Sequence, residues 1–516
     1  MQQAAAKGRR NSLAILTTGL ATVLFTSGCG NQYRPVVTAT NPVGPAGQPT
    51  KYAVAVSNPS ASAASCGLNY ATGAGETGLI TIVDVSGDTV LSTPNIGPAS
   101  NNNFFLPPSA FNCPLNPNIF SIDIATGSAG FIVDPNVGGF QSGGGFAVFP
   151  LSNPTTLLSQ DVVQSTLATG ANPTSVEAIT VTSTGSTVFV TQAGDSSVSP
   201  AIPASIAALN VTSGPSLLQS ITLADPTQVP AFVVGYDGTQ RVYALSEPSA
   251  GGIGAATAIE GTQLAISATI PVGNNPVYGV MTSDLKRAYI LNKGSGTVSV
   301  INVVNNALDS VVPTITLPQI TTPSGTTAPN PVWADYSLAT NELVVLNQGD
   351  GVNPGSLSII NIPLCSINTQ PANPNCSTTN PTDATGFGTI VATVPVGINP
   401  TMVSMLLDGS QAYVVNSGTT GTGAGASVSV VNLLNDVVTA TIPYDSTDEI
   451  DTQTTVVNKV FGHPNTVSAT TGSPTGKVYI TSPDDNYLTI LRTDNNTVQA
   501  HINLQGAGVR VLVNTR

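Results

Sequence analysis

Few side chains in this sequence are suited to acid–base or nucleophilic chemistry. The chain of 516 residues contains two histidines, His463 and His501. A nucleophilic site needs a base of this kind beside a serine or cysteine. His501 falls within a strand-like run, where a surface role is expected. His463 stands in the turn sequence Gly-His-Pro-Asn at the start of a repeat unit, where a structural role in the turn is favoured. The alternative is a position at the mouth of the central channel that such repeats would enclose, which makes it our one histidine candidate. We predict no catalytic residue; enzyme activity stays open, and a protein without it is favoured.

Metal and cofactor sites are not indicated by the sequence. We find no Gly-x-Ser-x-Gly elbow, phosphate-binding loop or histidine-rich metal motif in a sequence context that would support its function. The acidic segment 445–451 offers oxygen ligands for Ca²⁺, but it lacks the spacing and fixed glycine of a calcium loop. A solvated insertion is the better interpretation. Trp333 is the only tryptophan; we expect it to pack inside a sheet unit, with stacking on a sugar ring as the alternative. We expect no cofactor and no metal.

The N-terminus has the organisation of an export signal. Basic residues among positions 7–10 are followed by an apolar stretch over 13–25 and by Thr-Ser-Gly-Cys, which ends at Cys29. The stretch is too short to span a bilayer, which takes about 20 apolar residues. This segment resembles the lipobox of bacterial lipoproteins. The resemblance implies a signal peptide over 1–28, a lipid on Cys29 and a flexible linker over 29–50; an ordinary secretory signal is the alternative.

The other four cysteines form an even set, which is typical of disulfide-bonded exported chains. They are Cys66, Cys113, Cys365 and Cys376. Cys365 and Cys376 bound a short segment rich in asparagine and proline, so we predict one disulfide between them and a second between Cys66 and Cys113. Four cysteines allow three pairings. A zinc site is the alternative, but the cysteine spacings do not suit one.

Charge and composition indicate an all-β protein that does not bind nucleic acid. The net charge is −13, and charged residues make up 8% of the chain. Nucleic-acid binding needs clustered lysine and arginine, and no such cluster follows the leader. Apolar runs are short and are separated by turn residues, among them 50 glycines and 39 prolines. No long stretch after the leader has helical periodicity.

A repeat of about 45 residues organises most of the chain, which is the size of a β-propeller blade. Two copies match best, and each joins Pro-Val-Gly-x-Asn-Pro to an apolar strand that ends in asparagine and to a Ser/Thr-Val-Ser-Val strand. They cover 271–276, 286–294 and 296–302 in one copy, and 395–400, 411–418 and 426–432 in the other. A blade packs on its neighbours through both faces, which explains why its strands are apolar on both sides.

We predict a single β-propeller over 51–516 with about seven to eight four-stranded blades, eight by count. The strand over 508–513 has no hairpin partner after it, and 51–56 looks like the second strand of a blade. We expect the C-terminal strand to complete the N-terminal blade from the inside, because this removes both open edges. The later blades are expected to begin near Asn118, Pro173, Val229, Asn275, Asn330, Asn399 and His463. Insertions are expected at 57–78, 97–117, 318–330, 363–388 and 444–462.

The repeats resemble those of bacterial YVTN-type β-propeller proteins. The residues that carry this resemblance are 288–292 with 297–302, and 412–416 with 427–432. Members of that family are exported or surface propellers, and most have no assigned chemistry. The resemblance therefore implies an exported propeller and is nearly silent on what the protein does.

The leading hypothesis is a lipid-anchored propeller of the cell envelope that binds or scaffolds a protein or glycan without catalysis. Loops on a rigid ring are common binding surfaces, and the insertions are candidates for one. The alternatives are a lactonase-like or cofactor-assisted enzyme that uses the central channel, and a passive surface-layer or stalk protein. We expect a monomer without a nucleic-acid partner. Its lipid would hold it on the periplasmic or cell-surface side of a membrane, and the outer membrane is favoured.

Overall fold

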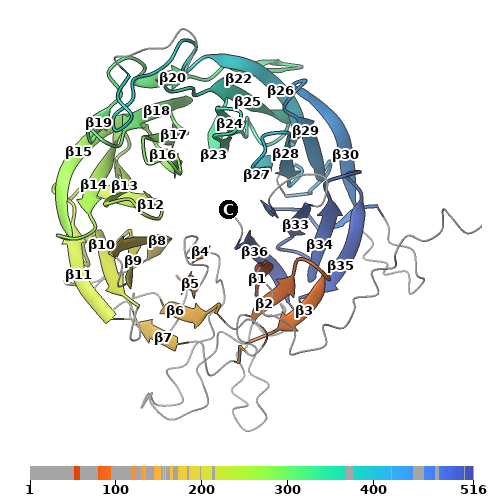
Figure 1. Cartoon of the computed structure of the whole chain (residues 1–516), viewed down its shortest axis with the longest axis horizontal. Helices are drawn as coiled ribbons and strands as arrows, with labels where there is room; N and C mark the ends of the chain where they lie inside the picture. Colours follow the sequence, from red (N-terminus) through yellow and green to blue (C-terminus); the bar gives the residue numbers. More distant parts are fainter. Residues whose placement is uncertain are drawn as a thin grey trace, which may run out of the picture. The chain divides into compact units, whose positions relative to one another are not determined.

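The computed structural model is an all-β propeller of eight blades, which confirms the predicted fold and the count of eight (Figure 1). Each blade is an antiparallel sheet of four strands, extended by a short fifth strand in two of them. The structure describes residues 51–58, 79–94, 119–122, 129–134, 145–152, 155, 157–158, 163–166, 172–182, 185–197, 199–211, 216–365, 376–419, 421–445, 458–470, 476–504 and 506–514. The leader, Cys29, Cys66 and Cys113 lie outside these residues. No helix among them is long and apolar enough to cross a membrane.

The first four blades, with strands given from the channel outward, are as follows. Blade 1 contains β36 (Ala507–Val513), β1 (Tyr52–Asn58), β2 (Leu79–Asp84) and β3 (Thr89–Ser92). Blade 2 contains β4 (Ile119–Ile122), β5 (Ala129–Asp134), β6 (Gly145–Pro150) and β7 (Val163–Thr166). Blade 3 contains β8 (Pro173–Thr182), β9 (Gly185–Gln192), β10 (Ser205–Asn210) and β11 (Ser216–Thr222). Blade 4 contains β12 (Gln228–Val234), β13 (Arg241–Pro248), β14 (Ile253–Glu260) and β15 (Ala265–Asn274).

The other four blades follow the same order. Blade 5 contains β16 (Pro276–Met281), β17 (Arg287–Asn292) and β18 (Thr297–Asn302), with β19 (Ala307–Leu308) and β20 (Thr314–Thr316) both paired to β18 at the outer edge. Blade 6 contains β23 (Pro331–Ser337), β24 (Glu342–Asn347), β25 (Pro354–Asn361) and β26 (Ile390–Ile398). Blade 7 contains β27 (Pro400–Met405), β28 (Gln411–Asn416), β29 (Ser427–Asn432), β30 (Val437–Asp445) and β31 (Val460–Phe461). Blade 8 contains β32 (Thr466–Ala469), β33 (Lys477–Thr481), β34 (Tyr487–Arg492) and β35 (Val498–Asn503).

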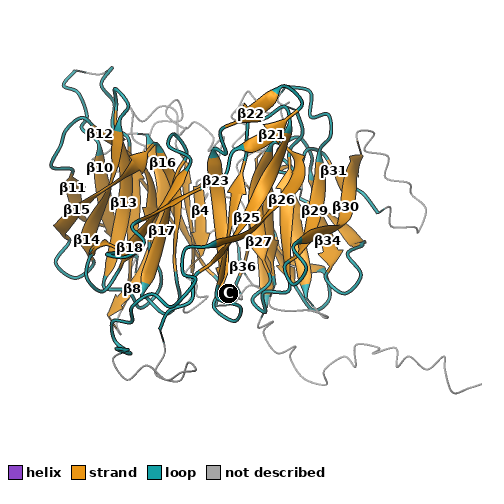
Figure 2. Ribbon diagram, turned by 90° about the horizontal axis from the view of Figure 1, so that it is seen from above, coloured by secondary structure: helices purple, strands orange, loops and turns teal. Residues whose placement is uncertain are grey.

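The C-terminal strand closes the ring as predicted. Strand β36 pairs antiparallel with β1, with Val54 opposite Leu512 and Val56 opposite Arg510, and it is the innermost strand of blade 1 (Figure 1). The innermost strands of blades 2 to 8 begin within about three residues of the predicted positions. Outside the blades, the insertion at 318–330 forms the hairpin β21 (Ile320–Thr322) and β22 (Gly325–Thr327), which lies on one face of the ring (Figure 2).

The hydrophobic core consists of eight clusters, one between each pair of neighbouring blades. Successive side chains of a strand point to opposite faces, so one strand contributes to two clusters. In β17, Ala288 and Ile290 pack toward blade 4, whereas Tyr289 and Leu291 pack toward blade 6. The remaining interfaces are built in the same way. No blade buries its own faces, so the described blades stabilise each other around the ring.

The asparagine that ends the second strand of the repeat is buried and binds the third strand. In blade 6, Asn347 Nδ2 donates hydrogen bonds to Ser356 Oγ at 3.1 Å and to Ser358 Oγ at 2.9 Å. Equivalent bonds join Asn292 to Thr297 and Ser299, and Asn416 to Ser427 and Ser429. A buried amide needs such partners, since leaving it unpaired costs about 1–3 kcal/mol. This explains why the repeat combines an asparagine with Ser/Thr-x-Ser.

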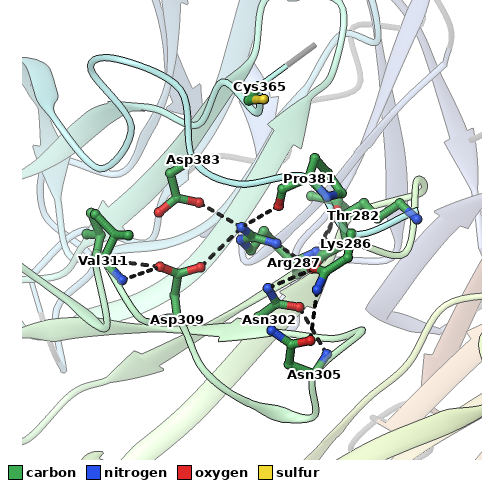
Figure 3. A network of polar contacts seen from close by, with 12 residues as sticks. Thr282, Lys286, Arg287, Asn302, Asn305, Asp309, Val311, Cys365, Pro381 and Asp383 are labelled. Carbon is green, nitrogen blue, oxygen red and sulfur yellow. Dashed lines mark hydrogen bonds and ion pairs between the residues drawn. The ribbon is translucent and has the colours of Figure 1, made fainter. Parts of the chain in front are cut away.

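The insertion at 363–388 of blade 6 docks on blade 5 through a buried arginine (Figure 3). The predicted disulfide between Cys365 and Cys376 is present in this insertion. Arg287 is 1% exposed, and its guanidinium lies between Asp309 at 3.1 Å and Asp383 at 2.7 Å. Burial raises the pKa of Asp383 to about 6, although Arg287 opposes this shift. Burial acts in the same sense on Asp309, but hydrogen bonds from two backbone N–H groups, a hydrogen bond with Asp383 and the charge of Arg287 together outweigh it and lower the pKa of that carboxyl.

Candidate functional site

The innermost strands of the eight blades enclose a cavity of about 220 Å³ in the central channel, and each of these strands contributes to its lining. Three lining side chains are aromatic: Phe232, Tyr278 and Trp333. Two are charged: Glu177 and Arg510. The others are aliphatic, hydroxyl-bearing or methionine side chains. Concave sites with apolar walls and a few polar groups are the usual form of small-molecule sites, so this cavity is the candidate site.

A repeated β-bulge precedes the lining residue in five consecutive blades. In blades 3 to 7, the pairing between the innermost and second strands shifts between a proline and the residue two positions later. These pairs are Pro173 and Ser175, Pro230 and Phe232, Pro276 and Tyr278, Pro331 and Trp333, and Pro400 and Met402. Proline has no N–H for the ladder, and a bulge reorients the side chain that follows it. The second residue of each pair lines the cavity.

The three aromatic rings are in contact across neighbouring blades and form an aromatic wall. The rings of Tyr278 and Trp333 are stacked, with centroids 3.9 Å apart and planes inclined by 23°. The centroids of Phe232 and Tyr278 are 4.8 Å apart, and these two rings are tilted by 49°. All three side chains are half-buried, so part of each ring remains accessible. Such a wall can hold a flat or ring-shaped ligand through dispersion and apolar contact.

Arg510 reaches Trp333 from a blade that is not its neighbour. Arg510 lies on β36 of blade 1, and its guanidinium carbon is 4.9 Å from the centroid of the Trp333 ring on β23 of blade 6. Among the described residues, its buried Nε has no hydrogen-bond partner. Burial lowers the pKa of Arg510, but a guanidinium stays protonated at physiological pH. The channel therefore contains a half-buried cation that has lost part of its hydration.

Glu177, on β8 of blade 3, is the carboxylate of the cavity lining. Its side chain lies beside Gly235, where a β-carbon would come within 3.1 Å of Glu177 Cγ. Among the described residues that line the cavity, no histidine and no second carboxylate accompanies it. The cavity thus lacks the paired carboxylates or the histidine base on which hydrolytic sites usually rely.

The two histidines of the sequence both belong to blade 8. His463 is in the loop before β32, where its backbone N–H donates to Asp484 Oδ1 at 2.8 Å and its Nδ1 pairs with the other carboxylate oxygen. Asp484 belongs to the hairpin between β33 and β34, so this pair holds the loop to the hairpin of the same blade. His463 is not among the residues that line the described cavity. His501 lies on the outer strand β35, as expected, and stacks on Phe461.

No protein-family model and no curated protein matches this chain. Solved structures do resemble it. Dihydro-heme d1 dehydrogenase NirN, in complex with DHE, matches with a TM-score of 0.53 and 12% identity over 90% of this chain and 76% of that chain. AztD of Citrobacter koseri matches with a TM-score of 0.49 and 10% identity over 90% of this chain and 97% of that chain. The periplasmic gluconolactonase PpgL of Pseudomonas aeruginosa matches with a TM-score of 0.46 and 16% identity over 76% and 95%. At such identities the likeness shows the fold alone, which is that of a β-propeller.

Proposed function

We propose that this protein is a lipid-anchored, YVTN-type propeller of the cell envelope that binds a ring-shaped ligand in its central channel without catalysis. The observation that carries this proposal is the aromatic wall of Phe232, Tyr278 and Trp333 in the channel cavity. A sugar residue of an envelope glycan is a ligand of this shape. The ring of blades supplies a rigid frame, which limits the entropy lost when a ligand binds.

The size of the cavity supports a small ligand. An apolar cavity of about 150 Å³ accommodates a benzene molecule, and the channel cavity measures about 220 Å³. One six-membered ring with a substituent therefore fits beside the aromatic wall. The hydroxyl groups among the lining residues, such as those of Ser121 and Ser175, provide the polar contacts that orient a ligand.

The envelope location is supported by two features of the chain. The disulfide between Cys365 and Cys376 is of a kind that persists in oxidising compartments outside the cytoplasm. The sequence that ends at Cys29 resembles a lipobox. We expect Cys29→Ala to release the protein into the soluble fraction, and mass spectrometry of the wild-type N-terminus to find a diacylated Cys29 peptide. An unmodified N-terminus and an unchanged soluble location would contradict the anchor.

Intrinsic fluorescence tests the channel site directly, because Trp333 is the only tryptophan in the chain. We expect soluble fragments of envelope glycans to change the Trp333 emission in a saturable way and to be recovered unaltered. Tyr278→Ala should weaken binding by about tenfold, since a stacked aromatic contact contributes about 0.5–1.5 kcal/mol beyond its buried area. Fragments that bind without any change in emission would place the binding surface on the insertions and contradict the channel site.

A further inference from the structure

We infer that the channel ligand is an anion, a molecule with one ring and a carboxylate, and that Arg510 binds the carboxylate. This inference rests on the proposed function of the channel and adds the chemical class of its ligand. It is carried by the surroundings of Arg510, which differ from those of every other arginine that the structure describes.

The other three described arginines each have a carboxylate partner. Arg287 lies between Asp309 and Asp383, and Arg241 Nε is 3.0 Å from Glu260. Arg492 pairs with Asp494 on an exposed turn. Arg510 is the exception, since within the described part of the chain its polar contact is with the Trp333 ring. Its pKa is lowered by burial, and the only charge effect that opposes this comes from the Tyr278 phenol, not from a carboxylate of that part.

An anion in the channel would supply the partner that Arg510 lacks. A cation that has lost water is costly unless it is paired and hydrogen-bonded. The Trp333 ring provides attraction but accepts no conventional hydrogen bond. Nε is buried from solvent and has no hydrogen-bond partner among the described residues, so no group of the described chain neutralises that side of the guanidinium. A carboxylate in the cavity would bind the two terminal Nη groups, which also offer two parallel hydrogen bonds.

The position of Arg510 also says what else the ligand contains. Its guanidinium is 4.9 Å from the centroid of Trp333, which itself stacks on Tyr278. A carboxylate bound by Arg510 therefore brings the rest of its molecule beside the aromatic wall, and the cavity has room for about one ring. Acidic sugars and aromatic acids both combine one ring with a carboxylate. Glu177, also in the lining, can accept hydrogen bonds from the hydroxyl groups of an acidic sugar.

Two acids and their neutral counterparts test the inference. The full exported protein is titrated with sodium glucuronate, sodium benzoate, methyl glucoside and benzamide, with Trp333 emission and calorimetry as readouts. We expect at least one acid to bind tenfold or more tightly than its neutral counterpart. Tight binding of glucuronate alone identifies an acidic sugar, and tight binding of benzoate alone identifies an aromatic acid. Arg510→Met should remove this preference, and Arg510→Lys should retain part of it, because lysine keeps the charge but not the planar fork.

Controls separate binding from a purely structural role of Arg510. Arg241→Met makes the same chemical change at a paired arginine away from the channel, and it should leave the preference for the acid unchanged. If Arg510 only stabilises the propeller, Arg510→Met will lower the melting temperature but will not change the ratio of the affinities for the acid and its neutral counterpart. That result would overturn the inference. If methyl glucoside and benzamide bind as tightly as the acids, the inference of an anionic ligand is overturned, whereas the proposed binding function of the channel is retained. No response to any of the four probes would overturn both.

Discussion

Ser468 Oγ accepts a hydrogen bond from the backbone N–H of Val513 at 3.1 Å, and this bond spans the junction at which the propeller closes. Ser468 lies on the innermost strand of blade 8, and Val513 lies on that of blade 1. The preceding junctions use the same device, since Ser404 Oγ accepts from the N–H of Ala469 and Asp335 Oδ2 accepts from that of Met405. Side chains of one blade thereby satisfy edge donors of the next, which an inner strand would otherwise leave unpaired.

We expect Ser468→Ala to loosen the closure of the ring. Loss of one buried hydrogen bond should lower the stability by about 1 kcal/mol, because the Val513 N–H loses its acceptor. Hydrogen exchange at Val513 should become faster. Ser404→Ala is the matched control, since it removes the same kind of bond between blades 7 and 8. It should accelerate exchange at Ala469 instead, and faster exchange at Val513 in both variants would argue against a local role of Ser468.

We expect Asn347→Ala to be among the more harmful single substitutions in the blades. The Asn347 side chain is fully buried, and its removal leaves two serine hydroxyls without their donor. A loss of about 2–3 kcal/mol follows from the cost of unpaired buried polar groups. A thermal melt of the purified protein measures this effect. Asn435→Ala, in an exposed turn, should change the stability by less than about 0.5 kcal/mol; equal effects of the two variants would refute the structural role given to the repeated asparagine.

The carboxylate pair around Arg287 predicts a pH effect. The pKa of Asp383 is about 6 in the folded protein and its ordinary value is 3.8, so the folded state binds more protons between these values. The contribution of Asp383 to stability therefore falls as the pH rises from about 4 to 6. We expect the melting temperature of Asp383→Asn, relative to the wild type, to be higher at pH 7 than at pH 4.5.

Asp309→Asn is a second test of this pH effect. The pKa of Asp309 is lowered, so its own carboxyl loses its contribution to stability only when the pH falls through its folded pKa. Its hydrogen bond and its charge also raise the pKa of Asp383. Asp309→Asn should therefore reduce the rise in the Asp383 pKa, so the wild type should lose more stability than this variant between pH 4.5 and 7. A melting-temperature difference for Asp383→Asn that is the same at pH 4.5 and 7 would show that the Asp383 carboxyl has no raised pKa.

The disulfide of the docked insertion should contribute measurably to stability. Cys365 and Cys376 are separated by 11 positions, and the chain-entropy estimate for a loop of this length is about 3 kcal/mol. We expect the double variant Cys365→Ser/Cys376→Ser to melt at a lower temperature and to be cleaved faster by protease within 363–388. The wild type in reducing agent provides a comparison. An unchanged melting temperature in both would mean that the bond stabilises neither the insertion nor the ring.

The sequence pattern was sufficient to predict the blades, because it is tied to local backbone chemistry. An asparagine in the left-handed region precedes a strand-opening proline at Asn172, Asn275, Asn330 and Asn399, and this pair marks the start of an innermost strand. Asparagine tolerates that region better than most residues. The strand boundaries of blades 3 and 5 to 7 could therefore be predicted to within a few residues.

The channel site was not predicted, because the ring brings together residues that are distant in the sequence. Trp333 was expected inside a sheet unit, and Phe232, Tyr278, Glu177 and Arg510 were not singled out. One signal was present in the sequence: Phe232, Tyr278 and Trp333 each stand two positions after a proline of an innermost strand. The contact between Trp333 and Arg510, which are 177 positions apart by their numbers, follows from the closed ring alone.

The pairing of β36 with β1 has a consequence for how the protein folds. Synthesis delivers the N-terminal strands first, so β1 lacks its inner neighbour until nearly the whole chain has been made. Until then its open edge can pair with other chains. The same late strand carries Arg510 into the channel, so a chain whose ring is not closed lacks this cation at the cavity. The anion proposed above would therefore bind only to molecules that have completed folding.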